Sequence, residues 1–231
     1  LIFEDGFESG NLSATQNGFR WTDSSNTTVS VTRACTGNHS LEFTYAAAAD
    51  NEDGMSEQRF FLGGNYRDVW FEYDLFVPEN YYHRSQTGPT NNKVFLYLWA
   101  NTYNDPRPLV AINFWADGTT GQSIGSVYTR PVDQHSFDFS APAISTSDVG
   151  KWLHIVVHYA YATVANNDGV AQIWKTPAGG STVQILNKTN GPWYHATGAG
   201  FDNGYLLGWA NSGFSQETRF YIDNVRVYQD P

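Results

Sequence analysis

Apolar and polar residues alternate along two neighbouring stretches in the middle of the chain, 93–101 and 109–116. Side chains of a β-strand point alternately to its two faces, so each stretch predicts a strand with one aliphatic face. The aliphatic faces hold Val94, Leu96, Leu98, Val110, Ile112 and Phe114. The opposite faces mix aromatic and polar residues: Lys93, Phe95, Tyr97, Trp99, Asn113 and Trp115. We expect the aliphatic faces to lie in the core.

The mixed face is too aromatic for ordinary solvent contact and too polar for a core. Flat rings beside amide and amine groups suit a sugar-binding groove, because the rings stack on pyranose faces and the polar groups bind hydroxyls. The alternative is that a second packed layer covers these rings.

The same alternation, bounded by turn-forming residues, recurs along the whole chain and predicts no helix. Further strands are predicted at 1–8, 29–34, 40–47, 56–63, 68–78, 123–129, 135–140, 152–162, 170–176, 182–188, 204–211 and 218–228. Many short strands without intervening helices predict an all-β fold, a two-sheet antiparallel β-sandwich. We expect residues 1–231 to form a single domain, since this length fits one large β domain.

Charge and hydropathy exclude two classes of partner. The net charge is −10 with 13 Lys and Arg, so we expect no nucleic-acid partner. No apolar run approaches the ~20 residues that span a bilayer, so we expect no membrane partner. An anionic polymer would be repelled at long range unless its groove is locally positive. The single cysteine, Cys35, is predicted to be a small buried residue.

Four segments resemble a known group of proteins: DGFESGNLS at 5–13, GNHSLEF at 37–43, GKWLHIVVHYA at 150–160 and YIDNVRVY at 221–228. They are similar to the concanavalin A-like jelly rolls, which include carbohydrate-binding modules, lectins, glycoside hydrolases and polysaccharide lyases. The resemblance covers nearly the whole chain and implies a jelly-roll sandwich that acts on or binds carbohydrate. Its residues are mostly framework positions, so they specify the fold better than the activity.

The resemblance also implies a structural Ca²⁺ site. In similar binding modules, the ion is held by an early Glu, a nearby Gly carbonyl, a carbonyl in a Gly-x-x-Ser-Leu turn and a late Asp. The matching positions are Gly6, Glu8, Asn38 and Asp223. Oxygen ligands of this kind suit Ca²⁺. Glu4 or Asp5 could replace Glu8, and the alternative is a metal-free pair or hydrogen-bonded carboxylates.

Glu72 and Asp74 form a carboxylate pair two residues apart in the predicted strand 68–78. Their α-carbons would lie roughly 7 Å apart on one face, and glycoside hydrolysis uses two carboxyl groups at about such a separation. The pair resembles the start of the Glu-x-Asp-x-Glu strand of a hydrolase family with this fold. Phe76 stands where that pattern has its second acid, so a solvated acidic pair is the alternative.

A further set has the residue types that polysaccharide lyases of this fold use. Such lyases bind a uronate carboxylate with Asn, Gln, His or Arg, and a His, Tyr or Lys base removes the C5 proton. The catalytic candidates are His154, His158, Tyr97, Lys93, Asn113 and Gln172, with His154, His158 or Tyr97 as the base. The substrate-binding candidates are Trp99, Trp115, Phe95, Arg84, Tyr205 and Trp174. We expect their strands to neighbour one another and to share one groove.

These observations predict a secreted, monomeric, polysaccharide-active protein, with a lyase that acts by β-elimination favoured. The alternatives are a non-catalytic carbohydrate-binding module or lectin, and an endo-acting hydrolase that uses Glu72 and Asp74. The Gln-Ile-His string of one alginate-lyase family is replaced by Gln-Ile-Trp at 172–174, so the lyase assignment depends on the residue types alone.

Overall fold

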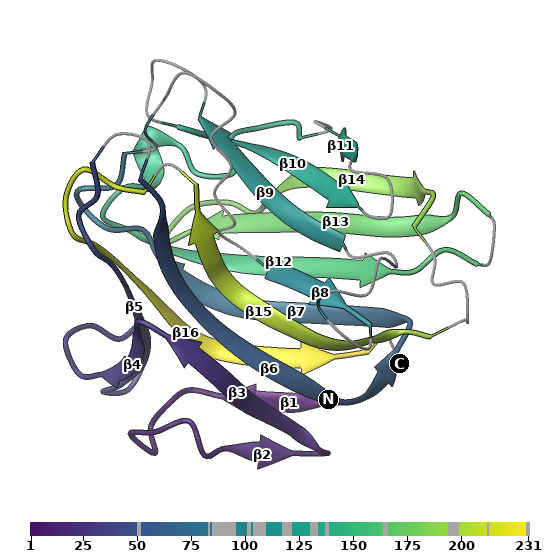
Figure 1. Ribbon diagram of the computed structural model, residues 1–231, viewed down its shortest axis with the longest axis horizontal. Helices are drawn as coiled ribbons and strands as arrows, with labels where there is room; N and C mark the ends of the chain where they lie inside the picture. The colour runs from purple at the N-terminus through teal and green to yellow at the C-terminus, as the bar shows by residue number, and fades with distance from the viewer. Residues whose placement is uncertain are drawn as a thin grey trace.

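The computed structural model describes residues 1–49, 52–82, 84, 96–100, 103, 110–116, 122–129, 134–136, 139–163, 166–193, 199–211 and 213–229. These residues form two antiparallel β-sheets that lie one behind the other (Figure 1). The only helical element among them is a 3₁₀ turn, η1 (Thr146–Asp148). The predicted all-β, two-sheet sandwich is therefore confirmed.

We call the first layer the β7 sheet, after a central strand. Its strands, in spatial order, are β14 (Val183–Gly191), β13 (Gly169–Pro177), β12 (Trp152–Ala160), β7 (Asp68–Phe76), β16 (Thr218–Tyr228), β5 (Ser40–Tyr45) and β4 (Thr27–Ser30). Strand β1 (Phe3–Asp5) also pairs with β16. The beginning and the end of the described chain therefore meet in one sheet.

We call the second layer the β6 sheet. Its strands, in spatial order, are β11 (Gln134–Ser136), β10 (Ser123–Thr129), β9 (Val110–Ala116), β8 (Leu96–Trp99), β15 (Phe201–Ala210), β6 (Gly54–Tyr66), β3 (Phe19–Ser25) and β2 (Thr15–Gln16). The two organising strands of the sequence are β8 and β9, which pair with each other. They occupy the middle of this sheet, beside β15.

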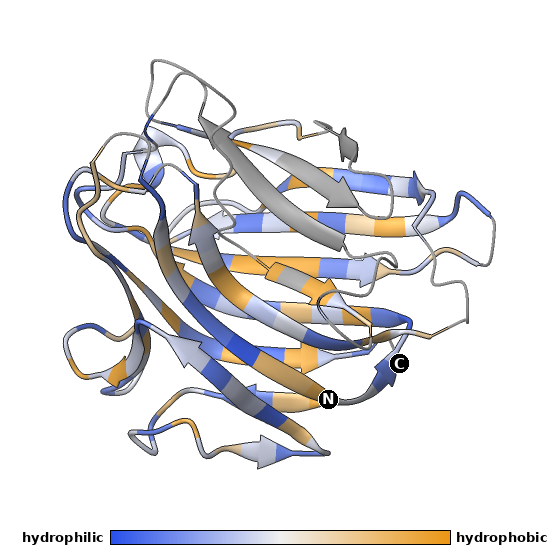
Figure 2. Cartoon of the chain, viewed as in Figure 1, coloured by the Kyte–Doolittle hydropathy of each residue, from blue (hydrophilic) through white to orange (hydrophobic). Residues whose placement is uncertain are grey.

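The core lies between the sheets and is built from alternate residues of each strand. Hydrophobic and hydrophilic positions alternate visibly along β7, β12 and β13 (Figure 2). On β7 the inward residues Val69, Phe71, Tyr73 and Leu75 are all at most 1% exposed. Leu96 and Leu98 of β8 are buried as the sequence predicts, whereas Val94 lies outside the described residues. Burial of each such side chain contributes about 1.5–3 kcal/mol to stability.

Strand β3 is not predicted from the sequence, because its second half, Thr-Asp-Ser-Ser, reads as a turn. A register shift interrupts its pairing with β6 between Trp21 and Ser24. The buried Gln58 of β6 spans this irregularity: its amide nitrogen lies within hydrogen-bonding distance of the Thr22 and Asp23 carbonyl oxygens, at 3.2 and 3.4 Å. A polar core residue therefore satisfies backbone groups that the ladder leaves unpaired.

Cys35 differs from its prediction. It lies in the turn between β4 and β5 and is exposed rather than buried. Burial of part of the side chain, together with the nearby charge and hydrogen bond of Asp74, raises the pKa of the Cys35 thiol to about 12. Since the thiolate is the reactive form, Cys35 is not set up as a nucleophile.

Candidate functional site

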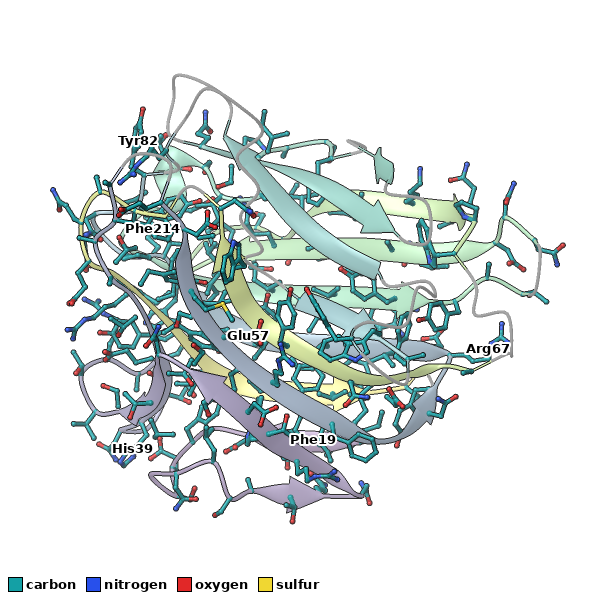
Figure 3. All side chains as sticks on the ribbon, viewed as in Figure 1. Phe19, His39, Glu57, Arg67, Tyr82 and Phe214 are labelled. Carbon is teal, nitrogen blue, oxygen red and sulfur yellow. The ribbon has the colours of Figure 1, made fainter. Side chains whose placement is uncertain are left out.

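A surface pocket of about 340 Å³ opens on the outer face of the β6 sheet. Its lining comes mainly from β6 and β15, whose register places Arg59 opposite Tyr205 and Met55 opposite Trp209. Glu57 lies between them on β6, where β6 runs beside β15 (Figure 3). The full lining is Met55, Glu57, Arg59, Tyr103, Tyr205, Trp209 and Asn211. Odd-numbered residues of β6 therefore face the pocket, while Ser56, Gln58 and Phe60 face the core.

Arg59 is a fixed cation in this pocket. Its Nε donates to Oε1 of the buried Glu57 at 2.5 Å. Burial lowers the pKa of Arg59, but the hydrogen bond and charge of Glu57 outweigh burial and leave that pKa raised. The guanidinium carbon lies 5.5 Å from the Tyr103 ring centroid and 6.0 Å from that of Trp99. No described residue accepts a hydrogen bond from its terminal nitrogens, so these can bind a ligand carboxylate.

The aromatic residues of the pocket differ in exposure. Trp99, Tyr103 and Tyr205 contact one another, with ring centroids 5.4 to 6.4 Å apart. Trp99 is only 5% exposed and Tyr205 1% exposed, whereas Trp209 is 40% exposed. Trp99, a predicted stacking residue, is therefore largely covered by its neighbours. Trp209 offers the more accessible ring to a sugar.

Strand β15 is distorted beside the pocket. Leu207 and Gly208 have consecutive positive φ values, 58° and 108°. The Tyr45 hydroxyl, in the core, donates to the Gly208 carbonyl oxygen at 2.8 Å. A Cβ at position 208 would lie 2.7 Å from the Tyr205 ring. Glycine is therefore required here both by the backbone and by the ring, and backbone strain of this kind concentrates at functional sites.

Several predicted site residues fall where side chains are not described. The backbone of Tyr97 pairs with Tyr205 on one side and with Ala111 of β9 on the other. Lys93 and Phe95 lie outside the described residues, as do the side chains of Tyr97, Asn113 and Trp115. Of the twelve predicted catalytic and substrate-binding residues, Tyr205 is the one whose described side chain lines the pocket, and Trp99 packs against Tyr205 and Tyr103 behind it.

The prediction that His154, His158, Gln172 and Trp174 share this groove is wrong. They lie on β12 and β13, which belong to the β7 sheet, while β8 and β15 belong to the β6 sheet. Strand β12 pairs with β7 and β13. Their roles as base or sugar contacts would therefore require a separate site on the outer face of the β7 sheet.

The two histidines on that face are held by neighbouring side chains. His154 Nδ1 lies 3.0 Å from Oδ1 of Asp74, and this hydrogen bond raises the pKa of His154. His158 has both ring nitrogens within hydrogen-bonding distance of oxygens, 2.9 Å from Gln172 and 3.0 Å from Asp68. Both ring nitrogens of His158 are therefore engaged by neighbouring side chains.

Aromatic rings on the outer face of the β7 sheet pack against one another. His158 stacks on Trp70 at 4.0 Å with an interplanar angle of 7°. Trp174 and Tyr228 lie nearly parallel to Trp70, with centroids 5.5 and 6.0 Å away. These rings therefore pack against one another, while Trp70 and Trp174 each keep part of their surface exposed.

The carboxylate pair of the hydrolase alternative also lies on the β7 sheet. Glu72 accepts a hydrogen bond from the Tyr228 hydroxyl. Burial would raise the pKa of Asp74, but hydrogen bonds from His154 and Asn224 outweigh it and lower that pKa. A glycosidase acid needs a raised pKa, so Asp74 has the opposite property.

Arg84, the predicted loop cation, donates to backbone rather than facing the pocket. Its terminal nitrogens bond the carbonyl oxygens of Ala48 and Ala49 at 2.8 and 2.7 Å, and the residue is 9% exposed. Arg59, which the sequence presents as one arginine among several, occupies the pocket instead. The signal for it was the Glu57-x-Arg59 spacing, because two residues apart on a strand share a face.

The predicted calcium ligands gather around one turn. Oε1 of Glu8 accepts hydrogen bonds from the backbone N–H groups of Asn38 and His39, both at 2.9 Å. These two bonds, that of His39 more than that of Asn38, lower the pKa of Glu8. Oδ2 of Asp223 accepts the N–H groups of Cys35 and Thr36. Both carboxylates thus hold the 35–39 turn directly. No group of three or more His, Cys, Asp or Glu among the described residues is arranged to hold a metal, and calcium binding stays a prediction.

Solved structures with a similar fold include three alginate lyases. A PL-14 alginate lyase from Aplysia kurodai has a TM-score of 0.62 at 13% identity, covering 91% of this chain and 90% of that one. A variant of alginate lyase Aly36B in complex with alginate trisaccharide has 0.62 at 14%, covering 99% and 98%. Alginate lyase vAL-1 from Chlorella virus has 0.58 at 10%, covering 93% and 94%.

Identities at this level show a shared fold and no more. No protein-family model and no curated protein matches the sequence. Among the described residues, no helix is long and apolar enough to cross a membrane. The chain therefore has the two-sheet jelly-roll fold that these three enzymes share, as the resemblance of its sequence predicts.

Proposed function

We propose that the chain is a polysaccharide lyase that cleaves a uronic-acid polymer by β-elimination in the Arg59 pocket. The observation that carries the proposal is the Arg59 guanidinium, which Glu57 holds through Nε in a pocket lined by aromatic rings. A cation with its terminal N–H groups available fits a sugar carboxylate, which a neutral glycan lacks. The alginate lyases that share the fold support the same substrate class.

The reaction needs a positive charge and two proton transfers. A base removes the proton beside the carboxylate, a carbon–carbon double bond forms, the glycosidic bond breaks and the leaving oxygen takes up a proton. Negative charge develops on the carboxylate group in the transition state, and Arg59 stabilises it there. Tyr103 is a partly exposed phenol of the pocket, and we assign the proton transfers to it and to Tyr97.

The net charge of −10 opposes the approach of a polyuronate, so local charge has to compensate. In the pocket Glu57 balances Arg59 and Asp23 adds a nearby negative charge, while Arg20 adds a positive charge on the same sheet face that no described carboxylate pairs with. On the outer face of the β7 sheet the basic side chains are already paired, His154 with Asp74, His158 with Asp68 and Arg226 with Glu72. We therefore place the substrate on the β6 sheet.

We also propose that the protein is secreted, because polymeric uronates are encountered outside cells, and that it acts as a monomer.

Carbohydrate binding without catalysis is the second candidate. The exposed Trp209 and the Asn211 amide at the pocket support it, since a ring next to an amide can stack on and bind a sugar without any catalytic group.

A polysaccharide panel separates these functions. The protein is incubated with alginate, polygalacturonate and neutral glucans, while ultraviolet absorbance of unsaturated ends and reducing ends are both recorded. A lyase gives both signals on a polyuronate, a hydrolase gives reducing ends alone, and a binding module gives retention on the glycan with neither signal. Arg59→Ala should abolish the lyase signal and Arg59→Lys should restore it only in part, because Lys lacks the planar fork. Unchanged turnover in Arg59→Ala would place the activity elsewhere.

A further inference from the structure

Arg20 differs from every other arginine that the structure describes. The other six each have a hydrogen-bond or ion-pair partner: Arg33, Arg59, Arg67, Arg84, Arg219 and Arg226. Arg20 has neither within the described part of the chain. Its one recorded contact is with a ring, since its guanidinium carbon lies 4.4 Å from the Phe61 ring centroid. Arg20 is also exposed.

The position of Arg20 relates it to the Arg59 pocket. Arg20 lies on β3 directly opposite Phe61 of β6. Phe61 is two residues beyond Arg59 on β6, so both project from the outer face of the β6 sheet. Arg20 and Arg59 are therefore diagonal neighbours across two paired strands, with backbone positions roughly 7–8 Å apart. Arg20 does not line the pocket itself and lies at one side of it.

The Phe61 ring gives the Arg20 guanidinium a support that leaves its donors available. A guanidinium group over an aromatic face is attracted by the ring and keeps its N–H groups directed outward in its own plane. A hydrogen bond to a neighbouring carboxylate would use those donors, and no described carboxylate does so. Arg20, oriented by the Phe61 ring, therefore lies beside Arg59, which is oriented by Glu57.

We infer that Arg20, supported by Phe61, forms a second carboxylate-binding subsite, which takes the uronate next to the sugar held by Arg59. The inference rests on the proposed function and narrows its substrate: the ligand is a polymer with a carboxylate on successive sugars. A polymer of this class offers one anion to each arginine, and the two contacts fix the direction and register of the chain. A neutral glycan gains nothing from Arg20.

The test compares Arg20→Ala with Arg33→Ala. Arg33 is a matched control, because its guanidinium also stacks on a phenylalanine, Phe76 at 3.8 Å, and its loss changes the net charge equally. Arg33 lies on the other side of the sandwich, where it pairs with Glu79. For each variant, KM and kcat are measured on alginate and polygalacturonate, and size-fractionated oligomers of the polymer that is cleaved are titrated against the protein. Melting temperatures confirm that both variants fold.

Arg20→Ala should raise KM for the polyuronate roughly 5- to 30-fold, the loss expected for one exposed charge-assisted contact, with kcat within about twofold. The loss should shrink as salt rises and should vanish for oligomers too short to reach past the Arg59 pocket. Arg20→Lys and Phe61→Leu should give intermediate values. Arg33→Ala should behave as the parent protein.

Equal KM values for Arg20→Ala and Arg33→Ala would overturn the subsite, as would an equal loss on the shortest oligomers. In either case the proposed function survives if Arg59→Ala still abolishes cleavage. If no polyuronate is cleaved or bound by the parent protein, the proposed function fails and the subsite fails with it.

Discussion

The outer faces of the two sheets carry similar residue types but treat them differently. On the β7 sheet, His154 pairs with Asp74 and His158 with Asp68 and Gln172, and Trp70 packs nearly parallel to three other rings. On the β6 sheet, Arg59 keeps its terminal nitrogens available and Trp209 is 40% exposed. Histidines and aromatic rings alone therefore do not mark a site. What distinguishes the candidate site is the Arg59 guanidinium, which Glu57 orients through Nε while its terminal nitrogens have no acceptor among the described residues.

The largest expected effect separates the two faces by turnover. Replacing a phenol that transfers a proton, by Tyr103→Phe or Tyr97→Phe, should reduce kcat on a cleaved polyuronate by about 10²- to 10⁴-fold. His154→Ala and His158→Ala should leave kcat nearly unchanged, because β12 lies in the other sheet. If the histidine variants were inactive and the tyrosine variants kept full activity, the active site would lie on the β7 sheet instead.

The distorted segment of β15 should respond more strongly to a methyl group than an ordinary turn does. Gly208→Ala combines a positive φ with a Cβ 2.7 Å from the Tyr205 ring, so a loss of about 2–4 kcal/mol in the free energy of unfolding is expected. Gly179→Ala is the control: its φ is 71° but nothing lies within 4 Å of the added Cβ, and backbone strain alone predicts about 1 kcal/mol. Denaturant midpoints measure both, and equal losses would show that the ring contact is unimportant.

Calcium would stabilise the β7 sheet rather than the β6 sheet, because the proposed ligands hold the 35–39 turn beside β16. At a free concentration 100 times Kd, a single bound ion would add about 2.7 kcal/mol. Ca²⁺ should then raise the melting temperature and a chelator should lower it, and Asp223→Asn should remove the response. If the melting temperature is the same with Ca²⁺ and after verified metal removal, the calcium site is contradicted. Glu8 and Asp223 would then serve only to accept hydrogen bonds from the backbone of the 35–39 turn.

Tryptophans on the two outer faces should also behave differently. Trp209→Ala should weaken glycan binding by about 0.5–1.5 kcal/mol through the loss of a stacking surface. Trp174→Ala removes the same side chain from the other face, where the ring packs near Trp70, and should leave the affinity unchanged. Titration calorimetry with an uncleaved oligosaccharide measures both. Equal losses would mean that the ligand contacts both faces.

The smallest effect concerns pH. The pKa of His154 is raised in the folded protein by its hydrogen bond to Asp74, so the folded state binds the proton more tightly than the unfolded state. The stability from this pair is fully present below the unfolded histidine pKa and is lost as pH rises through the folded value. The side chain is 45% exposed, which limits the contribution to about 0.2–1 kcal/mol. His154→Gln should flatten the fall in stability from mildly acid to mildly alkaline pH, and an unchanged slope would contradict this assignment.

The sequence by itself determined the strands and their inward faces. Alternation identified β7, β8 and β12 and predicted that Leu96 and Leu98 are buried, because period-2 patterning is a property of consecutive residues. It failed at β3, where a register shift and Thr-Asp-Ser-Ser break the pattern. It also failed at Cys35, whose exposure depends on how the 35–39 turn is held by Asp223.

Only the tertiary structure decided which strands share a sheet. The sequence placed His154 and Gln172 beside Tyr97, yet β12 pairs with β7 and β8 pairs with β15, over long separations that local patterning does not encode. The pairing of strands also decided which arginines have their N–H groups bound within the protein. Arg84 donates to backbone carbonyls, whereas Arg59 and Arg20 lie on the same outer face. An alternating pattern states that a side chain faces outward, but its neighbours on that face come from other strands, and these neighbours determine whether its charge is satisfied or available.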